Sequence, residues 1–70
     1  MPTPYEMVRQ IEQRIQCRTH GRVRRVSVEL GDQQVVLHGD APTYYSKQLA
    51  QHAVSEIVGG RHVVNAIEVH

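Results

Sequence analysis

The sequence predicts an α+β fold: one small domain over residues 1–70, of order αββαβ, in which a three-stranded sheet carries two helices packed on one face. The main evidence is hydrophobic periodicity. Apolar residues recur with helical spacing at about residues 4–18 and 44–58, and they alternate with polar residues at about 23–30, 34–41 and 62–69. A chain of 70 residues, 40% of them apolar, is long enough for one such globular domain.

The first helix has a defined start and end in the sequence. Thr3 can cap it, Pro4 fits its first position, and Glu6 lies where the carboxylate of a capping box belongs. Gly21 favours termination, because glycine readily adopts the left-handed conformation that closes many helices. The apolar face of this helix comprises Met7, Val8, Ile11 and Ile15.

Two strands joined by a tight turn follow, in the pattern of a β-hairpin. Gly31 and Asp32 supply the turn. Because Gly39 has no side chain, we expect the second helix to approach the sheet closely at that position. The residues expected on the buried face are Val26, Val28 and Leu30 from the first strand and Val35, Leu37, Gly39 and Ala41 from the second.

The second helix lies between two boundary signals. Pro42 ends the preceding strand because it cannot donate a hydrogen bond to a neighbouring strand, and Thr43 is a suitable N-cap. Gly59 and Gly60 end the helix near position 58. In the last strand, the alternating pattern predicts that Val63, Ile67 and Val69 point inward.

Asn65 is a polar residue in the inward register of the last strand. A buried amide that lacks a hydrogen-bond partner costs about 1–3 kcal/mol of stability. We therefore expect Asn65 to tie this strand to a neighbouring loop or helix end. Contact with a ligand is the alternative.

Charge is unevenly distributed along the chain. Residues 1–26 contain six arginines and two glutamates, which is net +4, whereas residues 27–70 contain two basic and five acidic residues, which is net −3. The basic part can attract anionic lipid, phosphate or an acidic protein surface, or it can be an ordinary solvated surface. The single cysteine cannot form an internal disulfide, and no apolar stretch is typical of a signal peptide or a bilayer span. These features favour a cytoplasmic location, or a module that is part of a larger protein.

No grouping in the sequence is typical of an active site, a cofactor site or a metal centre. Cys17 and His20 lie three residues apart at a helix end, which is a weak basis for a thiolate or metal site. The five histidines lack the close pairs typical of zinc sites, and the carboxylates are scattered. Nucleic-acid binding is not expected, because the chain has no Gly-x-x-Gly loop and no Phe or Trp for base stacking. We expect no enzymatic activity and no cofactor.

The stretch from residue 26 to residue 69 combines the Val-x-Leu-x-Gly pattern at Val35, Leu37 and Gly39, a helix with Lys47, Ala50 and Ala53, and Gly59 followed by the closing VVNAIEV of residues 63–69. In these features it resembles a BON domain, a small bacterial module of osmotic-shock protection proteins, some secretins and channel-associated proteins. The resemblance implies an αββαβ fold and a binding role, commonly toward phospholipid, without catalysis. It also implies relatives that are often periplasmic or envelope-associated.

Two surfaces are candidates for binding. The basic corner between the first helix and the first strand would attract anionic phospholipid. The sheet face that the helices leave open, or a free strand edge, would serve a homodimer or another protein. The basic corner comprises Arg18, Arg22, Arg24 and Arg25, and the second surface comprises Val36, Val64 and Ala66 together with Tyr44.

Overall fold

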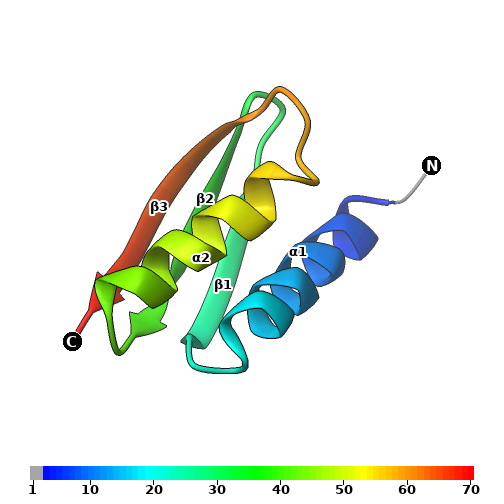
Figure 1. The fold of residues 1–70 in the computed structure, drawn as a ribbon. Helices are drawn as coiled ribbons and strands as arrows, with labels where there is room; N and C mark the ends of the chain where they lie inside the picture. Colours follow the sequence, from blue (N-terminus) through cyan, green and yellow to red (C-terminus); the bar gives the residue numbers. More distant parts are fainter. Residues whose placement is uncertain (1–2) are drawn as a thin grey trace.

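The computed structural model describes residues 3–70, which form two helices and three strands (Figure 1). Their order confirms the predicted αββαβ arrangement. The strand bounds agree with the predicted ones within one residue, and the first helix extends one residue further than predicted. The elements are α1 (Pro4–Thr19), β1 (Arg24–Leu30), β2 (Gln34–Ala41), α2 (Tyr44–Ser55) and β3 (His62–Val69).

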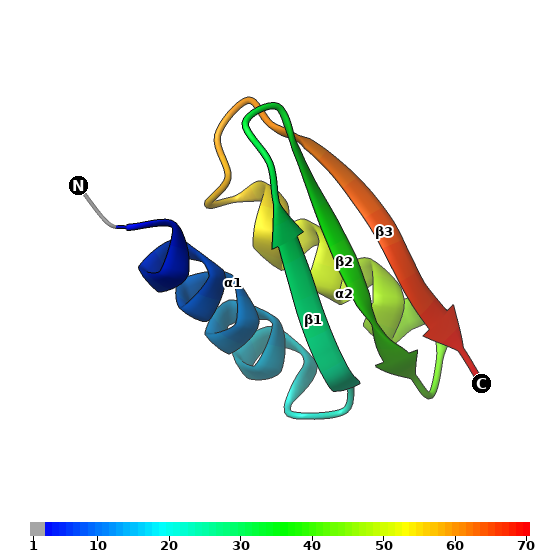
Figure 2. The same cartoon turned by 180° about the vertical axis from the view of Figure 1, so that it is seen from behind.

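The three strands form a mixed sheet with β2 in the centre. β1 and β2 run antiparallel as the predicted hairpin, whereas β2 and β3 run parallel and are connected through α2. Both helices cover the same face of the sheet, as the two opposite views in Figures 1 and 2 show. This arrangement confirms the predicted fold class and leaves the other face of the sheet open.

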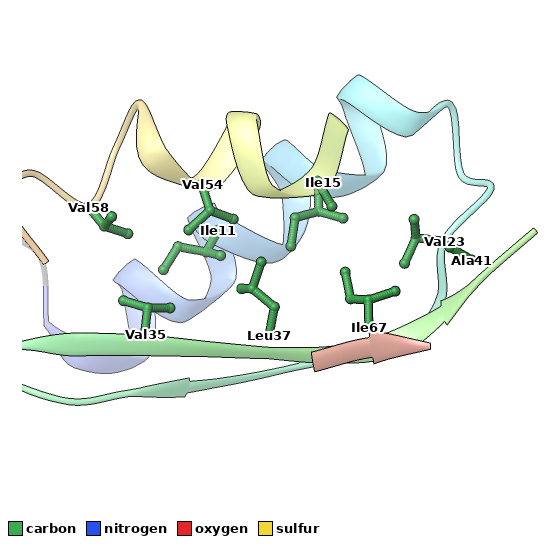
Figure 3. Packing of buried hydrophobic residues seen from close by; sticks show 10 residues of the cluster. Ile11, Ile15, Val23, Val35, Leu37, Ala41, Val54, Val58 and Ile67 are labelled. Atoms are coloured by element: carbon green, nitrogen blue, oxygen red, sulfur yellow. The ribbon is translucent and has the colours of Figure 1, made fainter. Parts of the chain in front are cut away.

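Aliphatic side chains from both layers meet between the helices and the sheet (Figure 3). Burial of one large aliphatic side chain contributes about 1.5–3 kcal/mol to stability. Because the chain has no Phe and no Trp, its folding free energy depends on these branched residues. The fully buried ones include Ile11 and Ile15 from α1, Val54 from α2, and Leu37 and Ile67 from the sheet.

Both predicted helix starts are confirmed. Thr3 Oγ1 accepts a hydrogen bond from the backbone N–H of Glu6 at 3.1 Å, and Pro4 occupies the first turn. Thr43 Oγ1 accepts one from the N–H of Ser46, also at 3.1 Å. Each bond satisfies a donor that a helix start otherwise leaves without a partner. Within residues 3–70, neither helix is long and apolar enough to cross a membrane.

The predicted end of the second helix near position 58 is wrong by three residues. α2 ends at Ser55, and the N–H groups of Ile57 and Val58 both donate to the carbonyl oxygen of Val54, at 3.0 and 3.1 Å. This tighter winding keeps Val58 buried while the chain begins to turn toward β3. Gly59 then adopts a left-handed φ of 67°, which glycine tolerates without steric cost.

A β-bulge interrupts β1, where residues 25 and 26 both lie opposite Gly39 of β2. Arg25 has a left-handed φ of 55° there. The extra residue shifts the alternation of side chains, so Val23 and Val26 both contact the core although they are three positions apart. Simple alternation would put Val23 on the open face, and no local sequence pattern predicted the bulge.

The role expected for Gly39 from the sequence is wrong, because Gly39 makes room for the bulge in β1 and not for the second helix. A Cβ atom at Gly39 would lie 2.9 Å from the backbone oxygen of Arg24 and 3.4 Å from Cγ1 of Val23. The close approach is therefore made by the chain entering β1, not by the second helix. Only a residue without a side chain leaves room for the bulged backbone.

Candidate binding surfaces

One end of the molecule gathers the α1–β1 loop, the β2–α2 turn and the end of β3 (Figures 1 and 2). The strand directions cause this, because β1 begins where antiparallel β2 and its parallel neighbour β3 end. A surface pocket of about 440 Å³ lies at this end. Its lining residues are Gly21, Arg22, Arg24, Asp40, Ala41, Pro42 and His70.

Arg22 and Arg24 are the exposed arginines of this pocket. Within residues 3–70, neither guanidinium group forms an ion pair with a carboxylate. Ala41 and Pro42 give the pocket an apolar wall. Two free guanidinium groups beside such a wall can bind a ligand that carries phosphate, because the planar donor fork matches phosphate oxygens.

The other two arginines of the predicted basic corner are paired with carboxylates. Arg18 pairs with Glu56, which Arg14 also approaches at 3.8 Å, and these contacts tie α1 to the chain just after α2. Arg25 projects from the bulge with 87% of its side chain exposed, and its Nε lies 3.5 Å from Oδ2 of Asp40. The positive charge of Arg18 and Arg25 is therefore partly offset.

The open face of the sheet carries a short apolar strip across β2 and β3. Val36 lies beside Val64 in the parallel register, and His38 lies beside Ala66. The two valines are half-buried, whereas Ala66 is exposed. The strand order thus brings together the three apolar side chains that the sequence analysis assigned to this face.

Tyr44 does not belong to that strip. It is the first residue of α2 and is 63% exposed, and α2 covers the opposite face of the sheet. The start of α2 lies instead at the end of the molecule that holds the pocket (Figure 1). Tyr44 is therefore placed nearer to the basic residues than to the apolar strip.

Asn65 joins β3 to α2 through its side-chain amide. Its Nδ2 donates to the backbone oxygen of Lys47 at 3.0 Å and to Oε1 of Gln51 at 3.3 Å. Its Oδ1 accepts a hydrogen bond from the N–H of Ile67 at 3.2 Å. Because both polar atoms of the amide are used, the geometry assigns Asn65 to holding α2 on the sheet.

Cys17 is exposed on α1 and lines a shallow pocket. Among the described residues that form this pocket there is no histidine and no carboxylate to act as a base. His20 follows the end of α1 and donates its backbone N–H toward Cys17 O. The other lining residues are Gln10, Gln13, Arg14 and Ile57.

A cluster of titratable side chains that the sequence analysis missed lies where β2 and β3 end. Asp40, Glu68 and His70 each place one oxygen or ring nitrogen within 4.8 Å of the other two. His70 Nε2 lies 3.1 Å from Asp40 Oδ1 and 3.7 Å from Glu68 Oε2. The carboxylates looked scattered because they are distant in the chain. Knowledge that β2 and β3 are parallel neighbours would have revealed the cluster.

In a comparison with protein families, the family model described as the BON domain matches residues 8–70. The match covers most of α1 and every later helix and strand. No curated protein and no solved structure matches the chain.

Proposed function

The chain belongs to the BON domain family, and from this membership we propose that it is a non-catalytic binding module that attaches to anionic phospholipid headgroups. The attachment surface is the basic end, defined as Arg22 and Arg24 with the flanking Arg18 and Arg25. BON domains are non-enzymatic modules, so binding is the property to explain.

The observation that carries this proposal is the pocket lined by Arg22 and Arg24. Both guanidinium groups are free of carboxylate partners within residues 3–70, so they can donate to phosphate oxygens without first breaking an ion pair. The apolar wall of Ala41 and Pro42 lies beside them. A headgroup phosphate would contact the two arginines while its glycerol part contacts the wall.

The expected affinity is low. An arginine close to an anionic membrane contributes about 1 kcal/mol, so Arg22 and Arg24 together contribute about 2 kcal/mol. Arg18 and Arg25 add less, because Glu56 and Asp40 offset part of their charge. Attachment should therefore be reversible, and it should weaken as salt screens the charges.

Tyr44 would add a contact at the same end. Tyr44 is 63% exposed and is the first residue of α2, close in the chain to Pro42 in the preceding turn. Tyrosine favours the membrane interface, because its ring is apolar and its hydroxyl can stay in water. This contact would deepen attachment only slightly, since one ring provides a small apolar area.

Co-sedimentation with vesicles tests the proposal. The full chain is mixed with phosphatidylcholine vesicles that contain or lack phosphatidylglycerol, at low and high salt. We expect pelleting only with phosphatidylglycerol and only at low salt. Charge reversal in Arg24→Glu or Arg22→Glu should lower the affinity for these vesicles by about thirtyfold, since each substitution exchanges an attraction of about 1 kcal/mol for a similar repulsion.

The matched control is Arg9→Glu, the same charge change in the N-terminal half of α1, where the exposed Arg9 donates a hydrogen bond to the hydroxyl of the exposed Tyr5 at 3.3 Å. It should pellet nearly as well as the parent chain. Equal pelleting with neutral vesicles, or equal losses for Arg9→Glu and Arg24→Glu, would exclude a specific role of the basic end.

The second candidate function is self-association through the open sheet face. It is favoured by the register that places Val36 beside Val64, and by the outer edges of β1 and β3, which pair with no further strand within residues 3–70. Sedimentation velocity at high concentration decides it: a dimer that Val36→Glu dissociates and Arg24→Glu leaves intact supports this candidate. A chain that remains monomeric excludes it.

A further inference from the structure

We propose that Asp40, Glu68 and His70 form a binding site for a divalent first-row transition metal ion, of which Zn²⁺ is the probe. The site lies on the open face of the sheet, at the end where β2 and β3 terminate. It does not depend on the lipid-binding proposal, since its ligand is a metal ion and its three ligating side chains differ from the arginines proposed to bind phosphate, although Asp40 and His70 also line the pocket beside Arg22 and Arg24.

The backbone places the three side chains together. Asp40 and Glu68 are direct partners in the parallel register of β2 and β3, so their side chains leave the same face of the sheet. His70 follows Glu68 by two residues and therefore shares that face. Its backbone N–H donates to the carbonyl oxygen of Ala41 at 2.9 Å, which holds the end of β3 against β2.

The distances between the candidate ligand atoms are close to those of a metal site. Zinc binds imidazole nitrogen and carboxylate oxygen at about 2.0–2.2 Å, so two ligands of a tetrahedral site are separated by about 3.3–3.5 Å. His70 Nε2 lies 3.1 Å from Asp40 Oδ1 and 3.7 Å from Glu68 Oε2. Small side-chain rotations would therefore bring all three atoms around one ion.

Arg25 orients one of these ligands. Its Nε lies 3.5 Å from Oδ2 of Asp40, whereas Oδ1 of the same carboxylate faces His70. The arginine can thus hold one oxygen while the other binds the ion, which is how outer contacts orient metal ligands in many proteins. The β-bulge, where Arg25 has its left-handed backbone, directs this side chain toward Asp40.

Electrostatics and ligand type favour a transition metal over Mg²⁺ or Ca²⁺. Like charges on directly paired strand residues repel, so Asp40 beside Glu68 gains from a cation between them. An imidazole ligand favours zinc, copper or nickel, whereas magnesium and calcium favour sites made only of oxygen. A surface hollow lined by Asp40 and Glu68 leaves space for water as a further ligand.

The test is calorimetric titration of ZnCl₂ into the full chain, prepared without a histidine tag and with Cys17→Ser to remove the exposed thiol. We expect one ion per chain. Asp40→Asn and His70→Ala should each weaken binding by about tenfold or more, because loss of a direct ligand costs at least as much as loss of an outer contact. Excess MgCl₂ should not displace the Zn²⁺.

His38→Ala is the matched control. His38 lies on the same open face and contacts Glu29, so it offers a competing two-residue site. We expect it to leave Zn²⁺ affinity unchanged. Unchanged affinity in His70→Ala, or a loss confined to His38→Ala, would overturn the proposal. His70 is exposed, so His70→Ala should fold, and circular dichroism verifies this for each variant.

Discussion

The two faces of β2 and β3 differ in what their side chains do, although residues of both faces alternate along the same strands. On the covered face, Val35, Leu37 and Ile67 are fully buried beneath the helices. On the open face, Val36 and Val64 stay partly exposed. Both faces carry similar aliphatic residues, so the difference in burial arises because the two helices cover only one face of the sheet.

This comparison separates the residues that stabilise the fold from those available for binding. Every charged or titratable group in the proposed lipid and metal sites lies outside the buried core. Changes at those sites should therefore alter binding with little effect on folding. Changes on the covered face should lower the stability of the fold and leave the binding residues in place.

The largest expected effect is on the covered face. Leu37→Ala should lower the free energy of unfolding by about 2–5 kcal/mol, because it leaves a cavity in the core. Val36→Ala, the adjacent residue on the open face, should cost less than about 1 kcal/mol. Urea denaturation followed by circular dichroism measures both values, and similar losses would refute the distinction between the faces.

If Leu37→Ala does not fold, Ile67→Val provides a milder version of the same experiment. Ile67 is 1% exposed, and removal of one buried methylene group typically costs about 0.5–1.5 kcal/mol. The open-face comparison for this variant is Val64→Ala. A loss for Ile67→Val no greater than that for Val64→Ala would count against the distinction.

A medium effect is expected where β1 bulges against β2. Gly39→Ala should lower the free energy of unfolding by about 1–3 kcal/mol, because the new Cβ would lie 2.9 Å from the Arg24 backbone oxygen. Gly60→Ala is the control, since a Cβ there would meet no atom within 4 Å. Chemical denaturation compares the two variants. A Gly39→Ala chain as stable as Gly60→Ala would mean that the bulge can move aside.

The smallest expected effect concerns the surface contacts between the helices. Glu56→Gln removes the carboxylate that Arg18 and Arg14 share, and it should cost about 0.2–1 kcal/mol because these side chains are about half exposed. The loss should shrink at high salt. Asp32→Asn in the β1–β2 turn is the same charge change away from the helices. If Glu56→Gln lowers the free energy of unfolding by more than Gly39→Ala does, this cluster of ion pairs contributes more to stability than the packing at the bulge.

Local sequence patterns predicted the helix starts correctly, because a cap involves residues only three positions apart. Thr3 and Thr43 illustrate this. The end of α2 was misjudged, because Gly59 and Gly60 are strong signals whereas the actual end depends on burying Val58 against the core. That burial is a tertiary contact, and no local pattern reports it.

The basic corner shows the same limit for a candidate site. The sequence revealed four arginines close together in the chain, but not that Arg18 pairs with Glu56, which is 38 positions away. It also missed that Arg25 would enter a bulge and approach Asp40. The pocket formed by the two remaining arginines became visible only when the ends of three strands were placed together.

The sequence alone determined the type and order of the elements, their caps and most of the inward-facing residues. These features depend on interactions between residues a few positions apart, and on a periodicity that each segment carries by itself. Tertiary structure alone decided that β3 pairs with β2 in parallel, that β1 bulges opposite Gly39, and that His70 reaches Asp40 across 30 positions. The physical reason is that such contacts depend on which strands become neighbours when both helices bury their apolar faces on one side of the sheet.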